Sequence, residues 1–339
     1  LILATGSRPQ PLPKLPFNGQ TILSSSDALT LEEIPGEILV LGGGVIGVEF
    51  AFIFNAFGTK VTVVEGPDRL LPLPSVDADS SKILQREMKK KRIPFYPGKT
   101  VTRAETAPEG KISLTLGPSP FLETVSEKDK KEIDLQVDKI LLTVGRIPNS
   151  EHLGLESIGV ELDDKGWIIV NSKMETNVEG VYAIGDVLGP SKMMLAHVAT
   201  MEGLVAVDNC LGGNREMNYQ AVPAAIYTFP EVADVGLTET QAQAAGIDYR
   251  ADKFLLRELG MAHAMGELAG QVKIVSEKKS GRIIGVHMIG AHVTELIAEA
   301  TLAVQQGTTV RNLAQTIHAH PSLAEGLWET ARRAVDHQP

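Results

Sequence analysis

One stretch of the sequence decides the fold: residues 36–65 read GEILVLGGGVIGVEFAFIFNAFGTKVTVVE. Residues 38–41 are an apolar run that predicts a buried strand, and this run leads directly into three glycines. The apolar residues 45–57 predict a helix, and residues 61–64 predict a second strand that ends at Glu65. The order strand, turn, helix, strand predicts a βαβ unit and therefore a parallel sheet covered by helices.

The turn of this unit has the spacing G-x-G-x-x-G. Gly42 permits a tight turn, Gly44 allows the backbone to approach a pyrophosphate, and Gly47 allows the helix to pack closely on the strand. The first turn of the helix offers free N–H groups and a partial positive charge to phosphate oxygens. We therefore interpret the unit as a dinucleotide-binding site rather than an ordinary glycine-rich turn.

Glu65, at the end of the second predicted strand, indicates which dinucleotide is bound. Its carboxylate can accept hydrogen bonds from a ribose 2′-hydroxyl, whereas its negative charge would repel a 2′-phosphate. The sequence therefore predicts NAD rather than NADP.

The composition is that of a globular protein of two to three domains, at ~150 residues per domain. The 339 residues are 43% hydrophobic and 22% charged, and the formal net charge is −10. Because no basic cluster is larger than residues 89–92, nucleic acid is not an expected partner. No apolar run approaches the ~18 residues of a membrane span, so no membrane partner is expected.

The cysteine and histidine content narrows the chemistry. Cys210 is the only cysteine of the sequence, which excludes a disulfide within it and favours a reducing, cytoplasmic location. We expect Cys210 to be a buried structural thiol. The histidines show no metal-ligand spacing, so no metal site is predicted. Since residues 1–4 already form an apolar strand pattern without an initiator Met, we expect the chain to be part of a longer protein.

The remaining pattern predicts two further regions. A polar helix near residues 76–91 and strands at 100–104, 112–116 and 137–144 complete the first α/β unit, with a solvated loop at 118–132. Strands at 167–170 and 181–184 precede a buried helix at 195–211. From residue 221, grouped strands (224–228, 232–237, 271–276, 283–289) and helices (238–245, 292–306, 310–315, 321–335) predict an α+β domain with an antiparallel sheet.

Six further segments, in this order along the chain, give the sequence a family resemblance. They are residues 4–7 (ATGS), 143–149 (TVGRIPN), 181–186 (VYAIGD), 194–197 (MLAH), 227–231 (YTFPE) and 318–325 (HAHPSLAE). Together with the glycine turn they resemble the flavin-dependent pyridine nucleotide–disulfide oxidoreductases, and within that family the dihydrolipoamide dehydrogenases. The resemblance extends from residue 1 to about residue 335.

The resemblance implies a fold with four parts. Residues 1–35 would be the last part of the first half of an FAD domain and a crossover, and residues 36–150 a Rossmann-like NAD domain. Residues 151–220 would be the second part of the FAD domain, and residues 221–339 an α+β dimerisation domain. The expected fold class is thus α/β, followed by an α+β interface domain.

The resemblance also assigns residues to two cofactors. One group would hold NAD: Gly42, Gly43, Gly44, Val45, Ile46, Gly47, Val48, Glu49 (near the nicotinamide), Glu65, Val101 and Gly145. A second group would contact FAD: Thr5, Gly6, Ser7, Asp186 (at the ribitol), Met194, Leu195, Ala196 and His197. Arg146, before a proline, more often forms a surface ion pair, and we assign it no catalytic role.

The segment at 318–325 supplies the expected catalytic pair. By resemblance His320 would be the acid/base and Glu325 its orienting partner, while His318 lacks the Pro-Ser-Leu-Ala-Glu sequence that follows His320. Pro321 is expected to open a helix, from which the Glu325 carboxylate would fold back to the imidazole and stabilise its charged form.

One departure from the family limits what this sequence can do. The family begins with its own FAD-binding βαβ unit and a C-x-x-x-x-C redox pair, and neither occurs here, so the chain resembles the part after the first ~120 residues. We expect the complete enzyme to oxidise dihydrolipoamide, passing electrons through a disulfide and FAD to NAD, and we expect this chain alone to be inactive. The implied partners are a second copy of the chain in a homodimer and the lipoyl domains of 2-oxo acid dehydrogenase or glycine cleavage complexes.

Two alternatives remain open from the sequence. The first is another family member, of the mercuric or glutathione reductase type. Glu65 argues against the NADP-dependent enzymes, and no C-terminal cysteine pair is present for mercury. The second is a nucleotide-binding or dimerisation module without catalysis.

Overall fold

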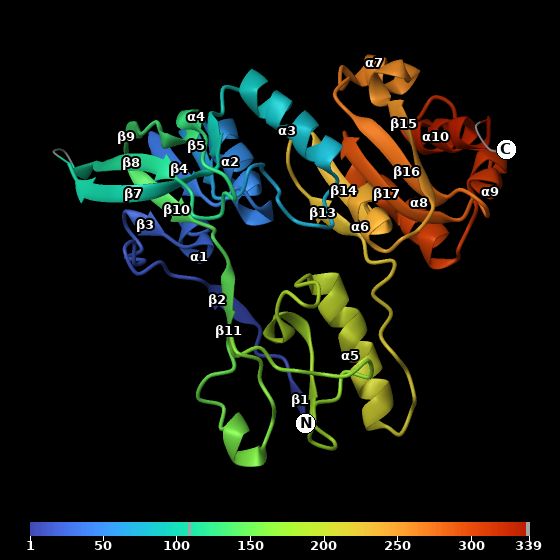
Figure 1. Cartoon of the computed structure of the whole chain (residues 1–339), viewed down its shortest axis with the longest axis horizontal. Coiled ribbons are helices and arrows are strands. Elements are labelled where there is room, and N and C mark those ends of the chain that lie inside the picture. Colours follow the sequence, from blue (N-terminus) through green and yellow to red (C-terminus); the bar gives the residue numbers. More distant parts are fainter. Residues whose placement is uncertain (108–109, 337–339) are drawn as a thin grey trace. The chain divides into compact units, whose positions relative to one another are not determined.

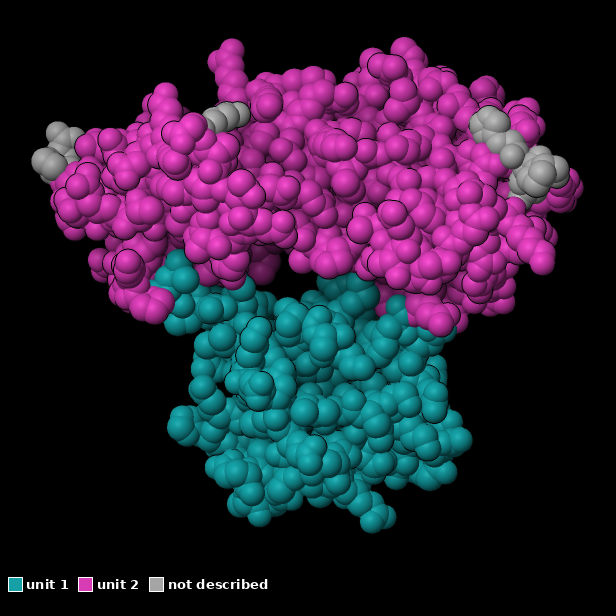
Figure 2. All heavy atoms as spheres, in the orientation of Figure 1, with its two compact units in different colours: residues 1–12, 145–219 teal, residues 13–144, 220–339 magenta. Residues whose placement is uncertain are grey.

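The computed structural model describes residues 1–107 and 110–336. The chain forms two compact units, coloured separately in Figure 2. The first unit combines residues 1–12 with 145–219, and the second combines residues 13–144 with 220–339. The four-part domain division expected from the sequence stays a prediction.

The first unit brings the N-terminal residues beside a segment more than 170 positions later. Strand β1 (Ile2–Leu3) pairs in parallel with β12 (Tyr182–Ala183), and β2 (Ser7–Pro9) pairs in antiparallel with β11 (Arg146–Pro148). The 3-10 helices η2 (Leu155–Ile158) and η3 (Gly185–Leu188) and the helix α5 (Ala196–Cys210) complete the unit. The pairing β1–β12 places residues 4–7 next to the turn that follows β12.

The predicted βαβ unit forms the centre of a parallel sheet in the second unit (Figure 1). Its strand order is β3 (Ile22–Leu23), β10 (Lys139–Leu142), β4 (Glu37–Leu41), β5 (Lys60–Glu65), β6 (Phe95–Pro97). Helix α1 (Ser25–Ala28) follows β3, α2 (Val45–Ala56) joins β4 to β5, and α3 (Ala78–Lys90) precedes β6. All pairs in this sheet are parallel, as the apolar strands predicted.

An antiparallel sheet is inserted between β6 and β10. Its order is β7 (Lys99–Thr106), β8 (Ile112–Pro118), β9 (Ile133–Val137). The predicted loop at 118–132 connects β8 to β9 and contains the short helix α4 (Glu127–Lys130).

The C-terminal part of the second unit is an antiparallel sheet covered by helices, which confirms the predicted α+β region. Its order is β13 (Ala224–Ile226), β14 (Glu231–Gly236), β17 (Ile283–Gly290), β16 (Gln271–Glu277), β15 (Tyr249–Leu255). The helical elements are α6 (Glu239–Ala244), η4 (Leu256–Glu258), α7 (Gly260–Met265), α8 (Val293–Gln305), α9 (Val310–Gln315) and α10 (Glu325–Asp336). The core of this sheet is built from its alternating buried residues and the apolar faces of α8, α9 and α10.

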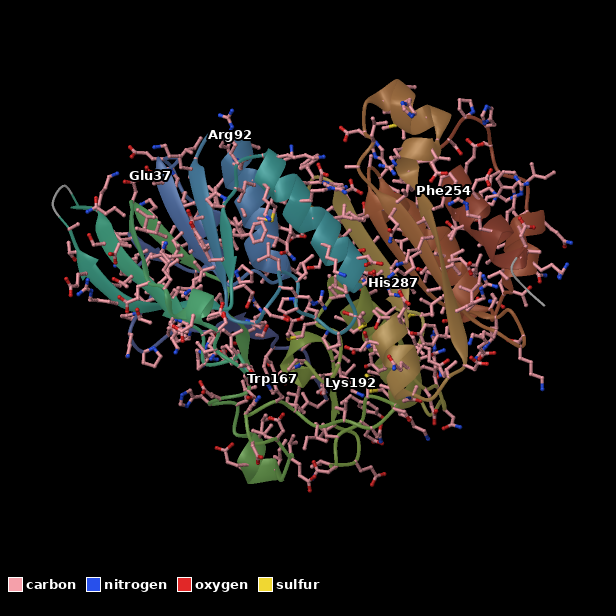
Figure 3. The ribbon with its side chains drawn as sticks, turned by 45° about the horizontal axis from the view of Figure 1, so that its top comes forward. Glu37, Arg92, Trp167, Lys192, Phe254 and His287 are labelled. Atoms are coloured by element: carbon pink, nitrogen blue, oxygen red, sulfur yellow. The ribbon has the colours of Figure 1, made fainter. Side chains whose placement is uncertain are left out.

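A buried ionic cluster joins α3 to this antiparallel sheet. The ammonium of Lys273 on β16 lies 2.7 Å from Asp77, 2.8 Å from Asp79 and 2.7 Å from Glu239. Next to it, His287 on β17, labelled in Figure 3, lies 2.6 Å from Asp234 on β14. Burying charges of one sign alone would be costly, so these acids and bases occur together.

Several sequence-based expectations are wrong in detail. Residues 167–170 form no extended strand but a single bridge, Ile168 with Leu162. The reason is local: the Asp163 carboxylate accepts the N–H groups of Lys165 and Trp167, so this segment is held in a turn. Strand β15 was not predicted, because charged residues interrupt its alternation and its pairing with β16 compensates.

Two further corrections concern residues singled out in the sequence. Cys210, the last residue of α5, is exposed and not buried. The last helix begins at Glu325 and not at Pro321, because the Ser322 N–H donates to the Glu325 carboxylate (2.9 Å) and residues 321–324 form a turn. In the described part of the chain, no helix has the length and apolar character needed to cross a bilayer.

Candidate functional site

The glycine turn after β4 has the geometry that a bound pyrophosphate requires. Gly42 has a φ of +110°, and a Cβ on it would lie 2.4 Å from the Thr143 carbonyl oxygen. A Cβ on Gly47 would lie 1.8 Å from the Gly42 carbonyl oxygen, so only glycine allows α2 to start this close to β4. Beside Gly44, in contrast, a Cβ would meet no described atom within 4 Å. The side of the turn at Gly44, at the N-terminus of α2, is therefore open to a ligand.

Glu65 lies at the carboxyl end of β5 and next to the same turn. Its carboxylate accepts the backbone N–H of Gly43 and, at 2.7 Å, that of Gly66. Burial raises the pKa of Glu65, and the two N–H donors oppose this rise. Because a carboxylate has about four acceptor sites, it retains acceptor capacity for a ribose hydroxyl.

The other predicted NAD residues lie on α2, on β7 and at the position directly before β11. Val45, Ile46, Val48 and Glu49 occupy the first turns of α2. Glu49 accepts the Tyr227 N–H at 2.9 Å, and burial raises the pKa of its carboxyl. Val101 lies on β7, and Gly145 has a φ of +141° with its carbonyl accepting the Gln10 N–H.

The first unit brings together the residues assigned to FAD at residues 4–7 and at Asp186. The Ser7 hydroxyl donates to Asp186 Oδ2 at 2.8 Å. Asn149 holds the preceding residues, because its side chain donates to the Thr5 carbonyl (2.9 Å) and its N–H donates to the Gly6 carbonyl (3.0 Å). Asp186 lies in η3, directly after the parallel strand β12, where ligands of α/β proteins commonly bind.

Residues 194–197 lie at the start of α5. The helix begins at Ala196 with Leu195 as its N-cap, and no side chain caps its first N–H groups. Met194 and Leu195 are half-buried, whereas Ala196 and His197 are exposed. Free N–H groups at a helix N-terminus suit a polar or anionic ligand, as predicted.

Two groups in this unit were missed by sequence reasoning. Arg146 was given no role, yet its guanidinium donates to the Ser7 hydroxyl (2.6 Å) and lies 3.6 Å from Asp186. Glu202 on α5 is 1% exposed and accepts the Gly185 N–H at 2.7 Å. The partners lie about 140 and 17 positions apart, so no local pattern pointed to either contact.

His320 and Glu325 lie together, as the sequence predicted. His320 Nδ1 is 2.8 Å from Glu325 Oε1, and the imidazole is 77% exposed whereas the carboxylate is 14% exposed. Burial opposes ionisation of Glu325, but hydrogen bonds from His320 and the Ser322 N–H outweigh it and lower its pKa. An ionised carboxylate at Nδ1 fixes the proton there and leaves Nε2 as the acceptor. The catalytic role itself stays a prediction.

His318 is distinguished from His320 by its surroundings. Its side chain is 5% exposed, with Nε2 3.0 Å from Glu299 and Nδ1 3.0 Å from the Thr316 carbonyl. Both ring nitrogens are therefore occupied. Among the described residues, His320 Nε2 has no such partner, so of these two histidines only His320 leaves a ring nitrogen open to a ligand.

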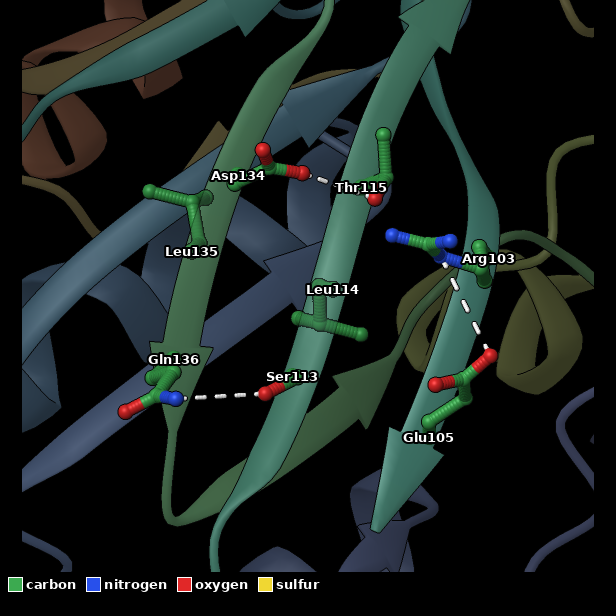
Figure 4. Close-up of a pocket in the computed structure, with 8 residues that line it drawn as sticks. All are labelled: Arg103, Glu105, Ser113, Leu114, Thr115, Asp134, Leu135 and Gln136. Atoms are coloured by element: carbon green, nitrogen blue, oxygen red, sulfur yellow. Dashed lines mark hydrogen bonds and ion pairs between the residues drawn. The ribbon is translucent and has the colours of Figure 1, made fainter. Parts of the chain in front are cut away.

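One surface hollow lies apart from these residues. A hollow of about 310 Å³ lies on the β7–β8–β9 sheet, shown in Figure 4. Its polar side chains pair with one another, as in Gln136 with Ser113 and Thr115 with Asp134. We assign it no ligand.

Comparisons with known proteins show the family to which the chain belongs. The family model described as pyridine nucleotide-disulphide oxidoreductase matches residues 1–203, and the dimerisation domain of that family matches residues 222–331. The dihydrolipoyl dehydrogenase of Chlamydia muridarum is 41% identical over 99% of this chain and 69% of its own length. That of Thermus scotoductus is 42% identical over 97% of this chain and 68% of its own length. The chain thus spans about two thirds of these relatives.

Solved structures agree. The crystal structure of LpdA from Mycobacterium tuberculosis superposes with a TM-score of 0.86 at 30% identity, covering 98% of this chain and 69% of that one. The HOCl-induced flavoprotein disulfide reductase RclA from Escherichia coli gives a TM-score of 0.84 at 26% identity, covering 98% and 72%.

These similarities confirm the predicted family resemblance and the predicted fold class. They also confirm the predicted activity class, a flavoprotein oxidoreductase of the dihydrolipoyl dehydrogenase type, and its cofactors FAD and NAD. The chain belongs to the pyridine nucleotide–disulphide oxidoreductase family.

Proposed function

We propose that this chain supplies the NAD-binding, flavin-contacting and acid–base parts of an enzyme that oxidises dihydrolipoyl groups with NAD. The observation that carries the proposal is the His320–Glu325 pair, in which an exposed imidazole has one nitrogen held by a carboxylate and the other free. The residues around the glycine turn and Asp186 support the cofactor assignments made above.

The acid–base step follows from the chemistry of the substrate thiol. A thiol of pKa about 8.5 is only a few per cent ionised at neutral pH, and the thiolate is the reactive form. His320 Nε2 takes the S–H proton, and Glu325 stabilises the resulting imidazolium through Nδ1. Such general base catalysis contributes about 10²- to 10⁴-fold in rate.

The thiolate then attacks an enzyme disulfide, one sulfur of which leaves as a thiolate. Cys210 is the only cysteine in the sequence, so these residues cannot supply both sulfurs of that disulfide. The second thiolate of the substrate displaces the remaining enzyme sulfur, which leaves the substrate as a disulfide and the enzyme as a dithiol. When bound, FAD and NAD would accept the two electrons of that dithiol in turn. Within this chain the residues around Asp186 would hold the flavin, and those around Gly42–Gly47 and Glu65 would hold NAD.

Partners and location belong to the same proposal. The match of residues 222–331 to a dimerisation domain supports a homodimer. By the family resemblance, the His320–Glu325 pair would serve the active site of the neighbouring subunit. The substrates would be lipoyl domains of 2-oxo acid dehydrogenase or glycine cleavage complexes. A single cysteine suits a cytoplasmic location.

Steady-state assays of the full-length protein test the proposal. We expect turnover of dihydrolipoamide with NAD and none of glutathione disulfide with NADPH. Efficient reduction of glutathione disulfide would instead identify a glutathione reductase. Protein limited to these 339 residues serves as a control and is expected to show no lipoamide turnover.

Nucleotide selectivity tests the assignment of Glu65. Replacing Glu65 with Ala removes the hydrogen-bond acceptor for the ribose 2′-hydroxyl and the negative charge that repels a 2′-phosphate. The affinity for NADH should therefore fall, and the ratio of NADH affinity to NADPH affinity should become smaller. Asp68, a neighbouring acid outside the turn, provides the matched control as Asp68→Ala. Equal NADH and NADPH affinity in the unmodified protein would contradict the ribose argument.

A further inference from the structure

A buried carboxylate, that of Glu202, holds the Gly185–Asp186 turn at which we propose that the flavin binds. Glu202 on α5 is 1% exposed, its Oε2 accepts the Gly185 N–H at 2.7 Å, and its Oε1 accepts the Tyr219 hydroxyl at 2.6 Å. Burial raises the pKa of Glu202, and these two donors oppose the rise. A buried carboxylate is costly unless it is hydrogen-bonded, so its position depends on the groups that it holds.

Tyr219 is itself fixed in place. Lys192, labelled in Figure 3, lies with its ammonium 4.9 Å from the centre of the Tyr219 ring. Burial, together with the hydrogen bond to Glu202, raises the pKa of the Tyr219 hydroxyl far above its usual range, so this hydroxyl remains a donor. The pair Tyr219–Glu202 therefore presents one carboxylate oxygen to Gly185.

The same turn has a second set of contacts, which Ser7 and Arg146 make with the side chain of Asp186. Gly185 has a φ of +73°, and Asp186 follows it in η3. Asp186 Oδ2 receives the Ser7 hydroxyl (2.8 Å) and lies 3.6 Å from Arg146 Nε. Within residues 1–107 and 110–336, no hydrogen bond falls on the other oxygen, Oδ1, which leaves it as the acceptor for a ligand.

We infer that Glu202 is a positioning residue for the flavin. From α5, Glu202 fixes the backbone of the Gly185–Asp186 turn. From strands β2 and β11, Ser7 and Arg146 fix the Asp186 carboxylate. The ligand would be the hydroxyl-bearing chain of a flavin nucleotide, which Asp186 Oδ1 would accept. The inference rests on the proposed flavoprotein function and adds a residue that touches no cofactor.

Loss of the Glu202 carboxylate should have different effects if Glu202 positions the flavin site and if its role is only structural. Without the carboxylate, the Gly185 N–H loses its acceptor and the turn can rotate, so Asp186 no longer meets the ligand in one orientation. A merely structural residue would lower stability without a selective loss of flavin affinity. Asn209 on the same helix offers the matched case. Among the described residues, its buried side chain bonds to the carbonyls of Lys173 and Arg215 and to the Arg215 N–H.

The experiment uses the full-length protein stripped of its flavin. FAD affinity is measured by fluorescence titration, bound-flavin geometry by visible circular dichroism, and stability of the flavin-free protein by thermal unfolding. We expect Glu202→Ala to weaken FAD binding about tenfold or more and to change the dichroism of the bound flavin. Glu202→Gln should recover most of the affinity, since its amide oxygen still accepts the Gly185 N–H and its amide nitrogen can donate to Tyr219. Asn209→Ala should lower the unfolding temperature without lowering the affinity for FAD.

The outcomes separate this inference from the proposed function. If the unmodified full-length protein failed to bind FAD, the proposed function would be wrong and this inference with it. If that protein bound FAD but Glu202→Ala changed the affinity less than twofold, the inference alone would be wrong. Should Glu202→Ala not fold, Glu202→Met, which keeps the length of the side chain and removes both acceptors, is measured with the same expectations.

Discussion

Two histidine–carboxylate pairs in the second unit share a short hydrogen bond but differ in their surroundings. His287 Nδ1 lies 2.6 Å from Asp234, and the side chains are 0% and 2% exposed. His320 Nδ1 lies 2.8 Å from Glu325, and the histidine is 77% exposed. The histidine–carboxylate distances are nearly the same, so the two pairs differ in what the second ring nitrogen contacts. His287 Nε2 lies 3.0 Å from the Leu237 carbonyl, whereas His320 Nε2 has no partner among the described residues.

This difference sets the charge of each ring. Both nitrogens of His287 face oxygen atoms, which favours a ring that carries a proton on each nitrogen. Burial acts to lower the pKa of His287, but Asp234 and the Leu237 carbonyl raise it. His320 has only one nitrogen engaged, so it can gain and lose a proton during a reaction. The burial of the first pair suits a structural role, and the exposure of the second suits the proton transfer that we propose for it.

The largest expected effect follows from removing the exposed imidazole. In the full-length enzyme, His320→Gln should slow flavin reduction by dihydrolipoamide about 10²- to 10⁴-fold, because the general base is lost. Flavin reduction by NADH should change little, since it needs no proton from the dithiol. Stopped-flow absorbance compares the two reactions. Equal slowing of both would mean that His320, like His287, has a structural role.

The buried pair should show the opposite behaviour. His287→Leu leaves Asp234 as an uncompensated buried charge and should lower the free energy of unfolding by about 3–5 kcal/mol. Urea unfolding measures this loss, and the thiol reaction of the folded protein should be unchanged. The double variant Asp234→Leu/His287→Leu should recover much of the stability, because two apolar side chains can replace a buried ion pair. A single-variant loss below about 1 kcal/mol would contradict the buried-ion description.

The carboxylate of the exposed pair should matter less than its histidine. In Glu325→Gln the amide oxygen can still orient the imidazole, but it cannot neutralise the imidazolium. The thiol reaction should slow about fivefold, equivalent to about 1 kcal/mol at a partly exposed pair. The same stopped-flow assay applies. A loss as large as that of His320→Gln would show that charge stabilisation, and not orientation, dominates.

The last expected effect is a gradual one and concerns pH. Because the folded-state pKa of His287 is raised, its contribution is fully present below the unfolded value of about 6.5 and is lost as pH rises through the folded pKa. The free energy of unfolding should therefore fall above about pH 6.5, by at most about 1.4 kcal/mol per pH unit. Unfolding curves between pH 6 and pH 9 measure this slope. The double leucine variant should lose the slope, and His320→Gln should keep it.

The sequence by itself determined the nucleotide-binding unit, because every part of it is local. The strand, the glycines, the helix and Glu65 lie within residues 36–65, and the steric demands at Gly42 and Gly47 leave glycine as the only residue that fits. The pairing of His320 with Glu325 was also predictable, since five positions in a turn keep the two side chains within reach. Even here the helix start was wrong by four residues, because the carboxylate caps the turn itself.

Only the tertiary structure decided which polar residues act together over long distances. Arg146 meets Ser7 because β11 pairs with β2 across about 140 positions, and Glu202 meets Gly185 because α5 packs beside η3. His287 and Asp234 were not singled out for their interaction in the sequence, since a lone histidine and a lone aspartate in two strands carry no local signal. The physical reason is that a hydrogen bond or ion pair depends on distance in space and on burial, and a strand register places such groups in contact whatever their separation along the chain.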